Sequence, residues 1–89
     1  MEFEWDLRKA ERNVTKHEVS FEEARTVFGD PLAATVQDSV HSESEMRFRT
    51  VGRSSQDRIL VVIHTDRGDQ IRLISARLAG ARERKQYES

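Results

Sequence analysis

Arginine is the residue type that most suggests chemistry in this sequence, and it is concentrated in the second half of the chain. Its planar guanidinium suits bidentate contact with phosphate better than a lysine ammonium does, and lysine is scarce over the same residues. The arginines therefore predict one surface for a phosphate-bearing ligand; the alternative is that they only cover solvated strand edges and helix faces. They are Arg47, Arg49, Arg53, Arg58, Arg67, Arg72, Arg77, Arg82 and Arg84.

Thiol and metal chemistry have little support in the sequence. The chain has no cysteine, which excludes disulfides, thiolate metal sites and a cysteine nucleophile. Its three histidines, His17, His41 and His64, lie far apart, and no two have the spacing of metal ligands on one helix. We expect neither a metal nor another cofactor.

Length and charge indicate one small soluble domain. A chain of 89 residues suffices for a single core, so residues 1–89 are expected to form one domain. Charged residues make up 35% of the chain but leave a net charge of -1, which gives no support to nucleic-acid binding. The sequence opens without a basic and apolar leader, and its longest apolar run, Ile59–Ile63, is too short to span a bilayer. These features predict a cytoplasmic protein.

The N-terminal residues predict a short strand followed by a helix. Phe3 and Trp5 alternate with acidic residues, which is the period-two pattern of a strand. Asp6 can cap a helix over Leu7–Lys16, which has apolar residues at helical spacing. Trp5 could stack on RNA, but a strand aromatic beside Phe3 is more often part of a core.

A second helix start is marked by Ser20 and Glu23. They fit a capping box, in which the Ser20 hydroxyl accepts from the Glu23 amide and the Glu23 carboxylate returns to the Ser20 amide. Val19 before this box can pack onto Ala24 as a hydrophobic staple. Gly29 is expected to end the helix.

The rest of the chain predicts a meander closed by a helix. A possible short strand near Ala34–Val36 precedes three stronger strands at Met46–Val51, Arg58–His64 and Gln70–Ala76. Short connectors rich in Gly, Ser and Asp predict antiparallel hairpins. The residues from Gly80 to Tyr87 are good helix formers. The expected fold is α+β, with helices packed on an antiparallel sheet.

The last hairpin decides which residues share a face of the sheet. If Arg67–Gly68 is a two-residue turn, Ile63 pairs with Arg72; a turn one residue longer would exchange the faces of one strand. With the shorter turn, one face carries Ile59, Val61, Ile63, Arg72, Ile74 and Ala76. The other carries Leu60, Val62, His64, Ile71, Leu73, Ser75 and Arg77.

Spaced residues along nearly the whole chain resemble the BrnT toxin family. The opening match is Phe3-x-Trp5-Asp6-x-x-Lys9-x-x-x-Asn13-x-x-Lys16-His17-x-Val19-Ser20-Phe21-Glu22-Glu23-Ala24. The closing match is Ile71-Arg72-Leu73-Ile74-Ser75-Ala76-Arg77, followed by Glu83-Arg84 and Tyr87. The resemblance implies a RelE-like ribonuclease fold, with an N-terminal strand, two helices, an antiparallel β-meander and a C-terminal helix.

The same resemblance implies a function and partners. Members of the BrnT family cleave RNA, arrest growth and are neutralised by a BrnA antitoxin that wraps the toxin, and the resemblance implies the same for this chain. The expected assembly is a dimer formed through the antitoxin, and promoter DNA is bound only by the toxin–antitoxin complex.

Four residues are candidates for RNA cleavage without a metal, which needs a base, an acid and cations around the phosphate. Arg77, matched to the family motif, is the first choice for a phosphate clamp, and Arg72 is the second. Tyr87 could stack a base or donate a proton, as the C-terminal aromatics of RelE-like nucleases do, and His64 could be an acid or base. Each has a structural alternative: Arg77 could pair with Glu83, and the others could serve the sheet edge, the last helix or the core.

Two further interpretations stay open. Lys16 and His17 end the first helix, where cations oppose the helix dipole, so we interpret them as chiefly structural. The whole chain could also be a non-catalytic binding module that co-folds with an antitoxin and contributes to promoter autoregulation, or a structural domain with no enzymatic role.

Overall fold

The computed structural model describes residues 1–40 and 45–89, so His41 lies outside the described residues. These residues form a mixed five-stranded sheet in the order β1-β5-β4-β3-β2, in which β1 is parallel to β5 and all other neighbours are antiparallel. The α+β class and the antiparallel meander are confirmed. The elements are β1 (Glu2–Glu4), α1 (Leu7–His17), α2 (Phe21–Ala24), the 3-10 helix η1 (Arg25–Gly29), β2 (Ala34–Gln37), β3 (Phe48–Arg53), β4 (Ile59–Arg67), β5 (Gln70–Leu78) and α3 (Ala81–Glu88).

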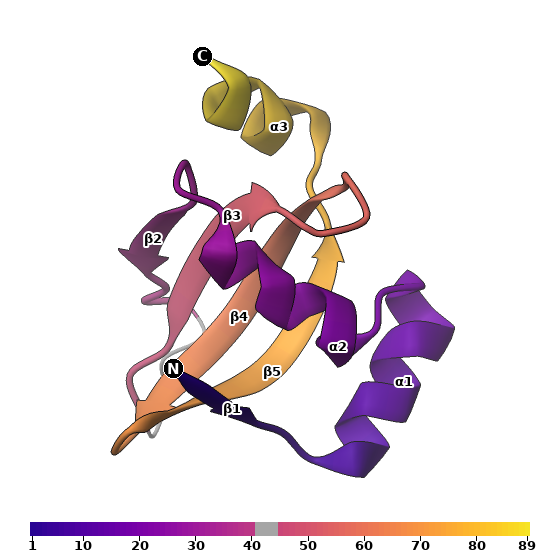
Figure 1. Cartoon of the computed structure of the whole chain (residues 1–89), viewed down its shortest axis with the longest axis vertical. Coiled ribbons are helices and arrows are strands. Elements are labelled where there is room, and N and C mark those ends of the chain that lie inside the picture. The colour runs from indigo at the N-terminus through magenta and orange to yellow at the C-terminus, as the bar shows by residue number, and fades with distance from the viewer. Residues whose placement is uncertain (41–44) are drawn as a thin grey trace.

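The two faces of the sheet are covered differently. Figure 1 shows α2 in front of the sheet, α1 to the side of the sheet next to β5, and α3 beyond the end of β5. The face under α1, α2 and η1, here called the helical face, carries the main core; the opposite one is the outer face. None of the described helices is long and apolar enough to cross a membrane. The buried main core consists of Val19, Phe21, Ala24, Val27, Leu60, Val62, Leu73 and Ala76.

Both predicted helix starts are present, but the capping box at Ser20 is only half formed. The Asp6 carboxylate accepts from the amides of Arg8 and Lys9, and the Ser20 hydroxyl accepts from the Glu23 amide at 3.0 Å. The predicted return bond from the Glu23 carboxylate to the Ser20 amide is wrong, because this carboxylate binds a cation further along the chain.

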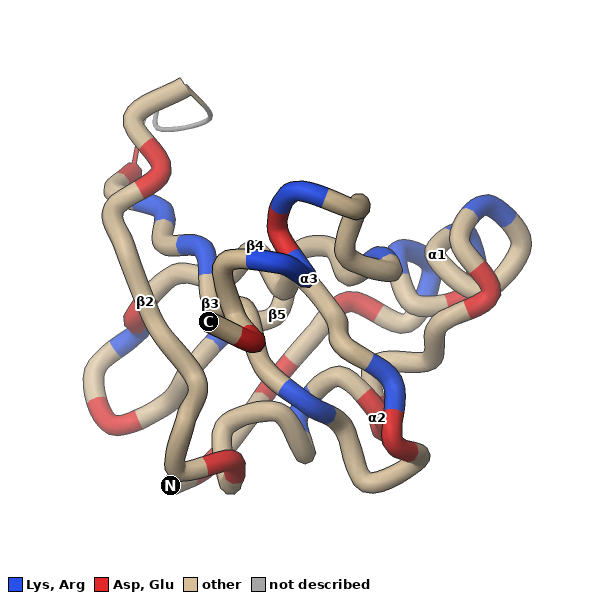
Figure 2. Tube along the Cα trace, turned by 90° about the horizontal axis from the view of Figure 1, so that it is seen from above, with Lys and Arg blue, Asp and Glu red and all other residues tan. Residues whose placement is uncertain are grey.

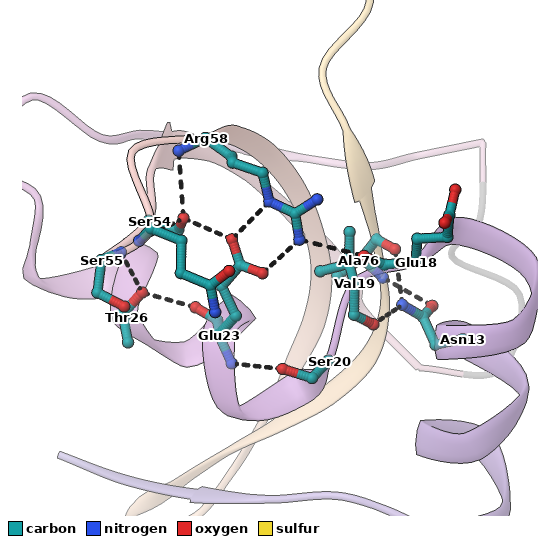
Figure 3. A network of polar contacts seen from close by, with 11 residues as sticks. Asn13, Glu18, Val19, Ser20, Glu23, Thr26, Ser54, Ser55, Arg58 and Ala76 are labelled. Atoms are coloured by element: carbon teal, nitrogen blue, oxygen red, sulfur yellow. Dashed lines mark hydrogen bonds and ion pairs between the residues drawn. The ribbon is translucent and has the colours of Figure 1, made fainter.

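Glu23 is the centre of a buried ion-pair network (Figure 3). Its side chain accepts from Arg58 Nε at 3.0 Å and from Arg58 Nη2, and it also accepts from the Ser54 hydroxyl at 2.6 Å. The Arg58 hydrogen bonds hold the pKa of Glu23 below its usual range. A charged partner forms a stronger hydrogen bond than a backbone amide does, so Glu23 joins α2 to the start of β4 instead of capping its own helix.

The second helix also changes type along its length. It begins as the α-helix Phe21–Ala24 and continues as the 3-10 helix Arg25–Gly29. The Thr26 hydroxyl donates to the Glu23 carbonyl at 2.6 Å, and this hydroxyl accepts from the Ser55 amide. Such back-bonding by a threonine hydroxyl competes with the regular helical ladder. The helix ends at Gly29 as predicted.

The predicted register of the last hairpin is wrong. Arg67 pairs with Gln70, so the turn residues are Gly68 and Asp69. Gly68 takes a φ of 62°, a left-handed conformation that costs glycine nothing sterically. Ile63 pairs with Ser75 instead of Arg72.

A β-bulge in β5 explains the face assignments that failed. His64 pairs with Leu73 while Ile63 pairs with Ser75, so Ile74 has no partner on β4. The extra residue reverses which side chains point to which face. Ala76 therefore lies in the main core, and Ser75 and Arg77 lie on the outer face with Ile63 and Val61. Upstream of the bulge the prediction holds, since Leu73 shares the helical face with Leu60, Val62 and His64.

The buried Asn13 side chain attaches α1 to β5 beyond the end of β1. Its Oδ1 accepts from the Ala76 amide at 3.1 Å, and its Nδ2 donates to the Ala76 carbonyl at 2.8 Å and to the Val19 carbonyl at 2.9 Å. This amide pairs with β5 as a neighbouring strand would (Figure 3). It sets the position of the C-terminal end of α1 against the sheet.

Replacement of this amide is expected to destabilise the whole domain. Asn13→Ala leaves the amide and carbonyl of Ala76 without their partner, and we expect the free energy of unfolding to fall by about 2–3 kcal/mol. Urea denaturation measures this. Glu11→Ala, an exposed position on the same helix, is the control and is expected to change stability by less than about 0.5 kcal/mol. Equal effects of the two variants would contradict the role given to Asn13.

Candidate nuclease site

The outer face of the sheet gathers arginines by simple alternation along β3. Phe48, Thr50 and Gly52 pair with residues of the helical face, whereas Arg49 and Arg53 pair with Ile63 and Ile59 of the outer face. Because successive side chains of a strand point to opposite sides, Arg49 and Arg53 both lie on the outer face.

A depression of about 360 Å³ on the outer face brings three elements together. β3 contributes Arg49, β5 contributes Arg77, and His17 enters from the last turn of α1. Cations and a titratable imidazole around one hollow are the groups that phosphate chemistry requires. The full lining is His17, Asp38, Val40, Arg47, Arg49, Ile63, Ile74, Ser75 and Arg77.

A larger groove of about 840 Å³ adjoins this depression, and Arg49 lines both. Strands β2 and β3 supply apolar side chains, and α3 forms the other wall. The groove is therefore mixed in character, with arginines beside apolar surface. Its lining is Leu32, Ala34, Val36, Arg49, Val51, Arg53, Arg82, Glu83, Gln86, Tyr87, Glu88 and Ser89.

Arg77 is held by a bidentate ion pair with Glu83, the structural alternative considered for it. Its Nη1 and Nη2 donate to Glu83 Oε1 and Oε2, each at 2.8 Å, and Nη1 also donates to the Leu78 carbonyl at 3.2 Å. Hydrogen bonds from Arg77 lower the pKa of Glu83 to about 2, and the Gly80 amide adds to this. These three bonds leave donors of the guanidinium, which has five N–H groups, for a phosphate oxygen.

Arg49 has no such partner. Among the residues that the structure describes, it makes no hydrogen bond or ion pair, although its charge contributes to the lowered pKa of Glu83. A guanidinium that lines two hollows without a fixed carboxylate can bind an anion without breaking an existing pair. Arg49 is therefore the arginine most ready to receive a phosphate.

Tyr87 fastens α3 to the body of the protein. Its hydroxyl donates to the Asp30 carboxylate, its ring packs on the small outer-face cluster around Val61, and the Arg53 guanidinium lies 5.9 Å from the ring centroid. The hydrogen bond to Asp30 raises the pKa of the Tyr87 phenol. The side chain lines the larger groove and also carries much of the attachment of α3.

Arg72 and His64 lie outside these two hollows. Arg72 donates to the Glu4 carboxylate of β1 at 2.7 Å. His64 is buried on the helical face, where its Nε2 shares a hydrogen bond of 2.7 Å with the Thr50 hydroxyl and its ring lies between Phe28 and Phe48. Burial lowers the pKa of His64. The bulge thus puts His64 and Arg77 on opposite faces of the sheet.

The sequence reasoning did not place His17 at this hollow. Its position at a helix end indicated a partner for the helix dipole. No local sequence signal showed that residues of β3 and β5 line the same hollow as His17. One usable signal was its place beside Lys16 in the family motif, four residues after Asn13. Arg49 was present in the arginine series but was not singled out, because strand alternation alone does not show which face holds a hollow.

Acidic and basic residues are interspersed along the trace (Figure 2). The arginine-lined hollows are therefore a local feature on a chain whose net charge is -1. Among the described residues, no three His, Asp or Glu side chains gather in a way that could hold a metal ion.

Comparison with known proteins assigns the chain to a family. The model of the ribonuclease toxin BrnT of type II toxin–antitoxin systems matches residues 5–83, and no curated protein matches the chain. The fold is similar to the 1.1 Å crystal structure of the Brucella abortus ribonuclease toxin BrnT, with a TM-score of 0.71, 23% identity, and coverage of 90% of this chain and 97% of that one. Since the family model spans most of the sequence, this chain belongs to the BrnT family of ribonuclease toxins of type II toxin–antitoxin systems.

Proposed function

We propose that this chain is an endoribonuclease that arrests growth by cleaving RNA at the depression between Arg49 and Arg77. The observation that carries the proposal is the convergence of guanidiniums from β3 and β5 on one hollow of the outer face. When a ribose 2′-oxygen attacks the neighbouring phosphate, negative charge grows on the phosphate oxygens. Fixed guanidiniums stabilise that charge more in this transition state than in the bound substrate.

Five residues receive roles in this proposal. Arg49 and Arg77 bind the phosphate, and Tyr87 lines the adjoining groove, where an aromatic ring can stack a base. Arg72 and His64 are assigned structural roles, because Arg72 is paired with Glu4 and His64 is buried against Thr50. The guanidiniums supply the positive charge, so we propose that cleavage needs no metal ion. RNA cleavage by the purified chain in excess EDTA tests this point.

Membership of a type II family implies an antitoxin partner. We further propose that this antitoxin is BrnA-like, that it joins two toxins into a dimeric assembly, and that promoter DNA is bound only by the complex in the cytoplasm. The RelE-like classification of the fold belongs to the same proposal, supported by the order of two helices, an antiparallel meander and a last helix. Co-expression with the neighbouring antitoxin is expected to restore growth.

One observation favours a second candidate function, a binding module without catalysis. Glu83 occupies the Nη1–Nη2 edge of the Arg77 guanidinium, and a bidentate phosphate could otherwise bind that edge. Normal growth and intact RNA on expression of soluble toxin alone would favour this second function. Growth arrest with RNA loss, reversed by the antitoxin, supports the nuclease.

Loss of Arg49 is expected to weaken both binding and cleavage of RNA. In Arg49→Ala we expect kcat/KM for a synthetic RNA oligonucleotide to fall by at least about tenfold, because one phosphate contact is lost. The slope of binding against salt concentration should fall as well. Arg84→Ala removes an exposed arginine of α3 that lines neither hollow and is the charge-matched control. If both variants lose activity equally, net charge and not the depression accounts for the effect.

The Glu83 carboxylate is expected to make stability depend on acid pH. Its pKa falls from 4.5 to about 2 on folding, so its contribution is present above pH 4.5 and is lost as the pH drops toward 2. Glu83→Gln should lower the free energy of unfolding at neutral pH by about 1 kcal/mol, with α3 less firmly attached. The difference from wild type should shrink over that pH range. Urea denaturation at several pH values measures it, with exposed Glu88→Gln as the control that should show no such dependence.

A further inference from the structure

We propose that His17 is the general base of the cleavage reaction and takes the proton from the ribose 2′-hydroxyl in the depression that it shares with Arg49 and Arg77. This inference rests on the proposed ribonuclease function and adds the group that the arginines cannot supply. A guanidinium stays protonated in proteins and has no acceptor, whereas a neutral imidazole has a lone pair at physiological pH.

The position of His17 is set by the fold. It is the last residue of α1, is half-buried and lines the depression. Asn13, one helical turn earlier, is bound to both backbone groups of Ala76, and Arg77 is the next residue along β5. Residues four apart lie on the same side of a helix, so the bond at Asn13 holds His17 against the strand that carries Arg77.

The groups around His17 suit proton removal next to a phosphate. The charged side chains that line the depression together with it are Asp38, which follows β2, Arg47 and Arg49 on the β3 side, and Arg77 of β5. Ser75 adds a hydroxyl to the same lining. A phosphate held by the guanidiniums places the attached ribose beside the imidazole, which is the proximity that general-base catalysis needs.

The step balances without a co-reactant other than water. The imidazole accepts the 2′-hydroxyl proton as the bond from O2′ to phosphorus forms and the bond from phosphorus to O5′ breaks. The leaving O5′ takes a proton from water, and the imidazolium gives its proton to the hydroxide that remains. The products are a 2′,3′-cyclic phosphate and a 5′-hydroxyl end.

The test separates chemistry from binding. The full chain, released from its antitoxin, is assayed with a labelled RNA oligonucleotide for cleavage and with its 2′-O-methyl analogue, which cannot react, for affinity. In His17→Gln we expect kcat to fall by about a hundredfold or more while affinity for the analogue stays within about twofold of wild type. The inflection that a titrating imidazole gives to the pH–rate profile should disappear. Lys16→Gln, the neighbouring exposed cation, should keep both rate and profile.

A second variant guards against misfolding. His17→Ala is expected to recover part of its activity in added imidazole, which a purely structural histidine would not show. The proposal is overturned if wild type cleaves RNA and His17→Gln cleaves it within about threefold of wild type, or if His17→Gln loses affinity for the analogue as Arg49→Ala does. Failure of wild type to cleave any RNA, with analogue binding intact, would instead overturn the proposed nuclease function itself.

Discussion

The pairing of the Asn13 side chain with Ala76 is the interaction on which the arrangement of the rest depends. β1 pairs with β5 only from Gln70 to Arg72, so no strand of the described residues lies beside the edge of β5 further along. The Asn13 amide supplies one donor and one acceptor there and binds the Val19 carbonyl as well. A buried backbone edge without partners costs free energy. One side chain therefore pairs with this edge of β5 and ties the segment between α1 and α2 to the sheet.

The bulge at Ile74 is the second constraint, because it decides which face of β5 carries charge. A regular pairing would put Arg77 on the helical face with Leu60 and Val62, where its charge would need a buried partner. The extra residue puts the small Ala76 into that core. It places Arg77 on the outer face, toward α3 and the depression. Bulges often re-aim a side chain next to functional sites, and this one does so for the residue matched to the family motif.

Several arginines of the second half of the chain form ion pairs that hold the fold together. Arg58 is bound to the buried Glu23, Arg72 is paired with Glu4, and Arg77 is paired with Glu83. The first two pairs join elements distant in sequence, and the third joins β5 to the following α3. The structural explanation of an arginine-rich half is therefore correct for part of it. What is left for a ligand is a small set around Arg49. This explains how a chain with a net charge of -1 can still present a cationic hollow.

The sequence by itself determined the elements of this protein, their order and its family, because caps, strand alternation, turn residues and spaced motif residues are local signals. Helix starts at Asp6 and Ser20, the central position of β4 and the last helix all follow from such signals. The tertiary structure alone decided which residues line the candidate site. The bulge at Ile74 changes the face of the sheet to which the following β5 side chains point, and no local sequence signal marks that bulge. The tertiary structure also decided that Glu23 binds Arg58 and that His17 lines one hollow with Arg49 and Arg77. Those contacts join residues far apart in sequence, and their energies depend on burial and on which partners the packed helices and sheet bring within hydrogen-bond distance.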